Sequence, residues 1–196
     1  MKFATKVTTE PTIEPITLGE AKDYAKVETD ADDVLLFDLV KSARQYVENF
    51  TRRALNTQTI TMTIDWCFPD SFELPINPVQ SITAASFTYV NSDGDVTVVP
   101  AATYTADTDS DPARIYLAYN QVWPTVRMQR KAISVVFVAG YGNKSTSIPE
   151  PIRTAIKMMA TYHYETRQPH MMGIGATSVS MPDTVKALLL PYTVLV

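Results

Sequence analysis

The stretch from Thr29-Asp30-Ala31-Asp32-Asp33 to Arg52-Arg53 decides the fold, because it predicts a long amphipathic helix over residues 31–53. Its apolar side chains recur at spacings of three and four, which places them on one face of a helix. They are Leu35, Leu36, Leu39, Val40, Ala43, Tyr46, Val47 and Phe50. We expect Asp30 to cap the first turn, and the two arginines complement the negative end of the helix dipole. The polar face, which we expect to meet solvent or a sister subunit, holds Asp38, Lys41, Arg44, Gln45 and Glu48.

Composition excludes several classes of protein. The 196 residues are 45% hydrophobic and carry a net charge of −4. This balance excludes a wholly disordered chain and gives no basic field for gripping nucleic acid. A single cysteine, Cys67, allows no intrachain disulfide and fits a reducing compartment. No apolar run suggests a signal peptide or reaches the roughly 18 residues of a membrane span, so we expect a soluble protein made in a cytoplasm.

Two shorter helices are predicted on either side of a β region. Thr17 and Glu20 have the spacing of a capping box, which predicts a helix over residues 18–27. Ser147 and Glu150 repeat that spacing before a helix over residues 149–166. The inward face of this last helix is expected to hold Ile152, Ala155, Ile156, Met159, Ala160 and His163.

Residues 57–142 change to the period of two that is typical of strands. Strands are predicted at 57–66, 82–90, 96–99, near Tyr104, at 114–117 and at 132–138, with a hairpin turn over 91–95. The predicted fold class is therefore α+β: a small bundle of three main helices with an inserted antiparallel β region and a C-terminal apolar arm. Residues 1–16 are expected to be an extended, poorly ordered arm. Residues 17–170 are expected to form one domain, with helices in 17–56 and 147–168, and residues 171–196 a flexible joint and the arm.

The residue patterns that carry enzyme chemistry are weak. The loop from Gly140 to Thr146 contains glycines and a lysine, but Asn143 separates Gly142 from Lys144, unlike a phosphate-binding loop. His163 and His170 are separated by Pro169, and Asp107, Asp109 and Asp111 lack the pattern of a calcium loop. We therefore predict no catalytic residue, cofactor or metal, and a protein that is not an enzyme.

The C-terminal segment is strongly apolar and follows the glycines Gly173 and Gly175. One interpretation is that it folds back onto the subunit's own core. The alternative, which we favour as a prediction, is a docking arm that is buried in another chain, since exposed apolar patches of this kind often mark interfaces. The predicted partner-binding residues are Val179, Met181, Val185, Leu188, Leu189, Leu190, Tyr192, Val194 and Leu195.

The order of motifs along the chain resembles that of tailed-bacteriophage head–tail connector proteins, also described as adaptor or head-completion proteins. The resemblance covers roughly residues 16–195 and is carried by Ile16–Lys22, Asp32-Asp33, Ala43–Glu48, Thr51–Leu55, Leu74–Ile82, Asp111–Arg114, Trp123-Pro124, Val136–Gly142, Pro149–Ile152 and Tyr164–Arg167. It implies a structural virion protein that forms a homo-oligomeric ring of roughly twelve subunits beneath the portal.

The function that the resemblance implies is viral assembly in the phage neck. The ring would join the portal to a tail-side neck or tail-completion protein, and DNA would pass through its channel without specific binding. Assembly would take place in the host cytoplasm, with no membrane partner. The alternative from another class is a nucleotide- or metal-dependent enzyme of phage DNA metabolism, and a third is a chaperone-like binding module that stays monomeric.

Overall fold

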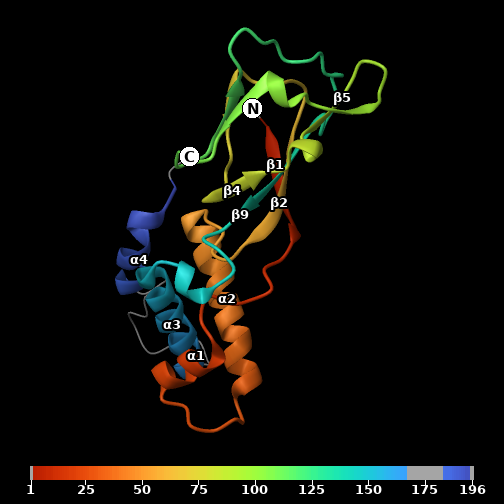
Figure 1. The fold of residues 1–196 in the computed structure, drawn as a ribbon. Helices are drawn as coiled ribbons and strands as arrows, with labels where there is room; N and C mark the ends of the chain where they lie inside the picture. Colours follow the sequence, from red (N-terminus) through yellow and green to blue (C-terminus); the bar gives the residue numbers. More distant parts are fainter. Residues whose placement is uncertain (1, 167–182, 195–196) are drawn as a thin grey trace, which may run out of the picture. The chain divides into compact units, whose positions relative to one another are not determined.

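The computed structural model describes residues 2–166 and 183–194, which form two compact units (Figure 1). The β unit contains residues 2–11 and 57–141, and the helical unit contains residues 12–56, 142–166 and 183–194. Helices and antiparallel sheets are both present, so the α+β class is confirmed. The described residues of the range 17–170, for which one domain was predicted, belong partly to each unit.

The helical unit has four α-helices among its described residues: α1 (Leu18–Ala25), α2 (Asp33–Thr51), α3 (Glu150–Glu165) and α4 (Asp183–Leu189). Two 3-10 helices, η3 (Ser145–Ser147) and η4 (Leu190–Tyr192), lie beside them in the chain. The helices α1, α2 and α3 contact one another, and α4 packs on α3 (Figure 1). The described part of this unit thus has four α-helices, where three main helices were predicted.

Helix α2 buries a narrower face than its apolar pattern suggests. Its buried apolar residues are Leu36, Val40, Ala43 and Val47, whereas Leu35 and Tyr46 are 37% and 45% exposed. Arg44, which we expected on a polar face that meets solvent or a sister subunit, is instead buried within the subunit and is only 4% exposed. Its guanidinium nitrogens lie 2.8 Å from the Glu14 carboxylate and 2.7 Å from the Glu48 carboxylate. A buried arginine needs such partners, and here they compensate its charge.

The capping box at α1 is confirmed, since Thr17 and Glu20 each accept a hydrogen bond from the other's backbone. Asp30 does not cap α2. It lies 2.6 Å from the Lys22 ammonium group, and Asp32 occupies the N-cap position without a side-chain capping bond. The Asp30 carboxylate, which we had assigned to the N-terminus of α2, therefore forms an ion pair with Lys22 instead.

The start and inner face of α3 also differ from the prediction. Ser147 belongs to η3, and Pro149 occupies the N-cap position of α3 without a side-chain bond. Ile152, Ala155, Ile156, Met159 and Ala160 are buried as expected. His163 is exposed, because the packed face of α3 ends one turn before it.

The β unit contains two antiparallel sheets where one was expected. The first has the order β1-β2-β9-β5-β6, with β4 also pairing with β9, and the second has the order β3-β8-β7. The strands are β1 (Phe3–Thr9), β2 (Gln58–Ile64), β3 (Ser71–Glu73), β4 (Val79–Ile82), β5 (Thr88–Val90), β6 (Val96–Val98), β7 (Tyr104–Asp107), β8 (Arg114–Leu117) and β9 (Ile133–Ala139).

The strands β2 and β9 form the core of the larger sheet. Ile60 pairs with Phe137, and Ile64 pairs with Ile133, and all four side chains are fully buried. The intervening residues of both strands are half-exposed. This alternation is what the period of two in the sequence predicts for a strand that is buried on one face.

The N-terminal arm is extended, as predicted, but it is part of the larger sheet. Phe3–Thr9 forms β1, which pairs with β2 from Phe3 opposite Ile64 to Thr9 opposite Thr59. Every residue of β1 is exposed. The sequence therefore gives no apolar alternation to read, and backbone hydrogen bonds to β2 fix the strand instead.

The predicted hairpin turn is confirmed in detail. The Asn91 side-chain oxygen accepts backbone N–H groups from Asp93, Gly94 and Asp95 at 2.9–3.0 Å. The strand predicted over residues 82–90 is interrupted, however, by the 3-10 helix η1 (Ala84–Ser86) between β4 and β5.

No helix in the described ranges is both long enough and apolar enough to span a bilayer.

Candidate functional site

The loop after β9 does not form a phosphate cradle. Gly142 has a φ of +145°, and a Cβ at this position would lie 3.0 Å from the Ser147 hydroxyl oxygen. The glycine is therefore required by the local turn and by the close approach of Ser147. Lys144 is exposed at the start of η3 rather than at the N-terminus of α3. The arrangement explains the glycine–lysine pattern without a nucleotide.

The described acidic residues that were considered as metal ligands form a turn instead. Asp107 accepts the backbone N–H groups of Asp109 and Ser110, each at 3.1 Å, and it also accepts the Ser110 hydroxyl. These hydrogen bonds, the Ser110 hydroxyl first, lower the pKa of Asp107. His170 lies outside the described residues. Within residues 2–166 and 183–194, no three His, Cys, Asp or Glu side chains are grouped to hold a metal ion.

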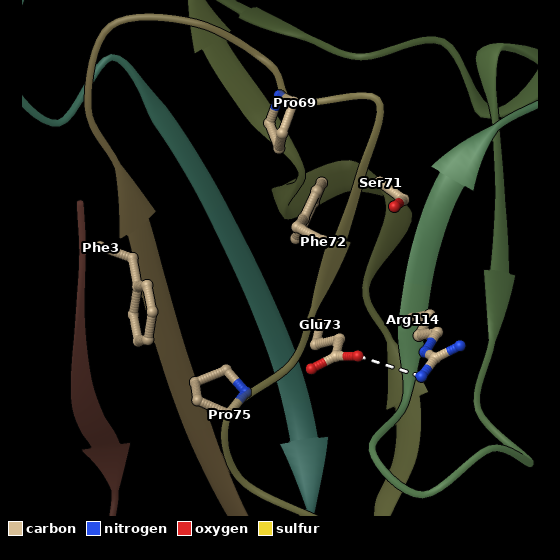
Figure 2. A pocket seen from close by; sticks show the side chains of 7 residues that line it. All are labelled: Phe3, Pro69, Ser71, Phe72, Glu73, Pro75 and Arg114. Atoms are coloured by element: carbon tan, nitrogen blue, oxygen red, sulfur yellow. Dashed lines mark ion pairs between the residues drawn. The ribbon is translucent and has the colours of Figure 1, made fainter. Parts of the chain in front are cut away.

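A hollow between β1 and the β3–β8 pair contains one pair of opposite charges (Figure 2). It has a volume of about 460 Å³ and is lined by Phe3, Pro69, Ser71, Phe72, Glu73, Pro75 and Arg114. Glu73 and Arg114 point toward each other, with a nitrogen–oxygen distance of 3.1 Å (Figure 2). The carboxylate of Glu73 is thus paired with Arg114. Glu73 is the one carboxylate among the lining residues, and a nucleophilic serine would need such a base for itself.

The C-terminal segment is largely part of the helical unit. Val185 and Leu189 are fully buried, and Val194 is 7% exposed. The Val194 N–H donates to the Thr51 carbonyl at 3.1 Å, and Arg53 donates to the Tyr192 carbonyl at 2.5 Å. The subunit itself therefore encloses three of the residues that we had assigned to a partner.

The other predicted contact residues differ in exposure. Leu190 is 56% exposed, and Leu188 and Tyr192 are half-exposed. Val179, Met181 and Leu195 lie outside the described residues. The apolar side chains that a partner can reach in the described segment are thus Leu188, Leu190 and Tyr192.

Comparison with known protein families identifies the family of this chain. Residues 15–112 match the model of a family described as "Phage gp6-like head-tail connector protein". The chain belongs to this family. The match begins just before α1 and runs through α2 and the β unit as far as Pro112. The chain is accordingly a structural head–tail connector protein and not an enzyme, and no curated protein matches it in sequence.

Solved structures share the fold of this connector. A chain from "Neck of empty GTA particle computed with C6 symmetry" is 24% identical, with a TM-score of 0.76 over 98% of this chain and 96% of that chain. A chain from "Virion of native gene transfer agent (GTA) particle" is 22% identical, with a TM-score of 0.75 over 97% and 95%. A chain from "Neck of native GTA particle computed with C12 symmetry" is 24% identical, with a TM-score of 0.72 over 100% and 96%.

The connector also has exposed apolar surfaces that the sequence analysis missed. On the helical unit, Val34 and Phe37 are 78% and 48% exposed, although both belong to α2. On the β unit, Trp66 is 44% exposed and lies beside a cluster of basic residues. The available signal in the sequence was that α2 has apolar residues on more than one face, so one face alone could not bury them all.

Proposed function

We propose that this connector forms a closed homo-oligomeric ring of roughly twelve copies in the neck of a phage-like particle. The ring joins the portal to a tail-side neck or tail-completion protein and surrounds the channel through which DNA leaves the head. The observation that carries this proposal is the family match over residues 15–112. The neck structures with C6 and C12 symmetry support the ring, because their subunits share this fold.

The surface of the isolated chain supports an assembling protein. Val34 is 78% exposed on the helical unit, and Tyr119, Val122 and Met128 are 80% to 99% exposed on the β unit. Each such side chain leaves apolar area in contact with water, and large exposed patches mark interaction sites in soluble proteins. Burial between subunits, or against the portal, would remove this area from water.

The charge of the chain suits a channel through which DNA slides. The net charge is −4, and a strongly basic lumen would bind phosphate groups tightly. DNA therefore passes through the ring without specific contacts. Subunits assemble in the host cytoplasm and remain in the neck of the finished virion.

The C-terminal segment contributes a second contact, to the portal or to a neighbouring subunit. Leu188, Leu190 and Tyr192 offer its reachable apolar side chains, while Val185, Leu189 and Val194 hold the segment to its own helical unit. Leu190→Asp adds a charge at a 56% exposed position and should leave the subunit folded but unable to join heads. Leu189→Asp, at a buried position, should instead unfold the helical unit.

The ring is tested by measuring the mass of the purified chain over a wide concentration range, by native mass spectrometry and mass photometry, with negative-stain microscopy of the largest species. We expect one closed species of about twelve subunits with an open centre. A wild-type chain that stays monomeric at every concentration would contradict the ring. Saturable ATP binding that Lys144→Ala abolishes would contradict a purely structural role.

A further inference from the structure

A hollow on the β unit gathers cations around an exposed tryptophan. Its volume is about 680 Å³, and we term it the aromatic–basic hollow after five of its lining residues, Lys2, Phe3, Trp66, Arg130 and Lys131. The three basic residues are exposed. None of the three has an ion-pair partner among the residues that the structure describes.

Backbone hydrogen bonds fix the shape of this hollow. The Asp65 N–H donates to the Lys2 carbonyl at 3.2 Å, and the Trp66 N–H donates to the Gln129 carbonyl at 3.0 Å. The Asp65 carboxylate accepts the Lys131 N–H at 2.7 Å. Three separate segments of the chain are thus held around Trp66, whose φ of 77° lies in the left-handed region. Strained backbone of this kind clusters at functional sites, and the exposed indole offers an apolar contact among the cations.

The helical unit presents the opposite charge together with exposed apolar groups. Residues 22–38 include six acidic and two basic side chains. Lys22 pairs with Asp30 and Asp33 at 2.6 and 2.8 Å. Glu28 and Asp38 remain exposed and have no ion pair within the described part of the chain. We term this region, with the exposed side chains Glu28, Val34, Phe37 and Asp38, the acidic corner.

We propose that the aromatic–basic hollow of one copy receives the acidic corner of a neighbouring copy. Val34 and Phe37, one turn apart on α2, would pack against the aromatic rings of the hollow. The carboxylates of the corner would face its cations. This inference rests on the proposed ring, because a ring of identical subunits is closed by contacts between two different surfaces of the same chain.

Charge complementarity selects a second copy as the occupant. The two surfaces have opposite charge and each contains exposed apolar groups, which is the arrangement that gives specificity in an interface. Duplex DNA is the competing occupant of a basic surface. It would leave Val34 and Phe37 exposed and would have to approach a chain of net charge −4.

Charge reversal on each surface tests the proposal. The hollow variant is Arg130→Glu/Lys131→Glu, and the corner variant is Glu28→Lys/Asp38→Lys. The control, Lys6→Glu/Lys144→Glu, changes the net charge as the hollow variant does, at exposed lysines outside both surfaces. The mass of each chain is measured by native mass spectrometry over a concentration series, and circular dichroism checks folding. For a variant that does not fold, the neutral pair Arg130→Gln/Lys131→Gln or Glu28→Gln/Asp38→Asn replaces it.

We expect each reversed variant alone to require at least about tenfold more protein than the wild type to assemble, because like charges then face each other. The control should assemble as the wild type does. An equal mixture of the hollow and corner variants should form rings that contain both chains in equal number, since native and exchanged contacts then alternate around the ring. The neutral pairs should weaken assembly without rescue by mixing.

Normal assembly of the folded hollow variant would overturn the proposal, as would an equal mixture that stays blocked. Loss of duplex DNA binding by the hollow variant with an unchanged ring would show that DNA is the occupant instead. A wild-type chain that never assembles contradicts the ring as well, whereas a wild-type ring with unaffected variants contradicts only this contact.

Discussion

Replacing Arg44 with methionine should destabilise the helical unit far more than the loss of an exposed charged residue would. Methionine keeps much of the apolar stem but removes the guanidinium group, which lies 2.8 Å from Glu14 and 2.7 Å from Glu48. Both carboxylates have only 14% exposed side chains. They would remain in the folded state without their positive partner.

The expected loss in the free energy of unfolding at pH 7 is about 3–5 kcal/mol. Two charge-assisted hydrogen bonds at about 1.5–3 kcal/mol each give a similar total, and removal of one partner from a buried ion pair costs about 3–5 kcal/mol. An exposed pair would contribute at most about 1 kcal/mol. The difference between these ranges separates a buried charge cluster from a surface salt bridge.

The pH dependence gives an independent check. Burial raises the pKa of Glu48, although Arg44 and the Leu55 N–H partly offset this effect. Without Arg44 the pKa should rise further. A carboxyl with a raised pKa in the folded state binds more protons when folded, so stability falls as pH rises from the unfolded pKa through the folded pKa. The loss caused by Arg44→Met should therefore be smaller below the pKa of an unfolded glutamate than at pH 7.

Urea unfolding followed by circular dichroism measures both effects. Lys186→Met, at an exposed position of α4, is the matched control and should change stability by less than about 0.5 kcal/mol. Adding Glu14→Gln and Glu48→Gln to Arg44→Met should recover part of the loss, because no unpaired charge then stays buried. A loss below about 1 kcal/mol for Arg44→Met, equal at both pH values, would refute this reasoning.

Three further predictions follow from the same structure. Thr17→Ala should cost about 1 kcal/mol of stability by urea unfolding, with Thr12→Ala as the neutral control. Burial raises the pKa of Glu20, but the Thr17 N–H and Arg153 outweigh this effect and lower it. The stability that Glu20 contributes is therefore lost as pH falls through that lowered pKa. Leu189→Ala should cost about 2–5 kcal/mol and Leu190→Ala less than about 0.5 kcal/mol, since they are 0% and 56% exposed; equal losses would contradict the packing of α4. Fluorescence anisotropy should detect no tight, salt-sensitive binding of the purified chain to duplex DNA.

Elements with a buried, periodic face were predictable from the sequence. The alternation in β2, the buried positions of α3 from Ile152 to Ala160 and the capping box at Thr17 were found as expected, whereas His163 was not. β1 was missed because all its residues are exposed and only backbone pairing with β2 holds it. The burial of Arg44 was missed because its partner Glu14 is 30 residues away in the sequence.

The candidate binding surfaces were less predictable than the fold. An apolar C-terminal segment is compatible both with a partner and with the subunit's own core, and only tertiary packing shows that Val185, Leu189 and Val194 are buried in the latter. The aromatic–basic hollow combines residues 2–4, residues 63, 65 and 66, and residues 130–131. No local pattern connects these segments, because the register of β1 on β2 and the backbone bonds around Asp65 bring them together.

Head–tail joining in the absence of this protein tests the central claim most directly. Particles from a producing strain that lacks the chain would be imaged by electron microscopy, before and after addition of the purified wild-type protein. The structural connector account predicts separate filled heads and tails before addition, and joined particles with a new ring of density at the neck afterwards. Normally joined particles in the deletion strain, with no density missing from the neck, would contradict it.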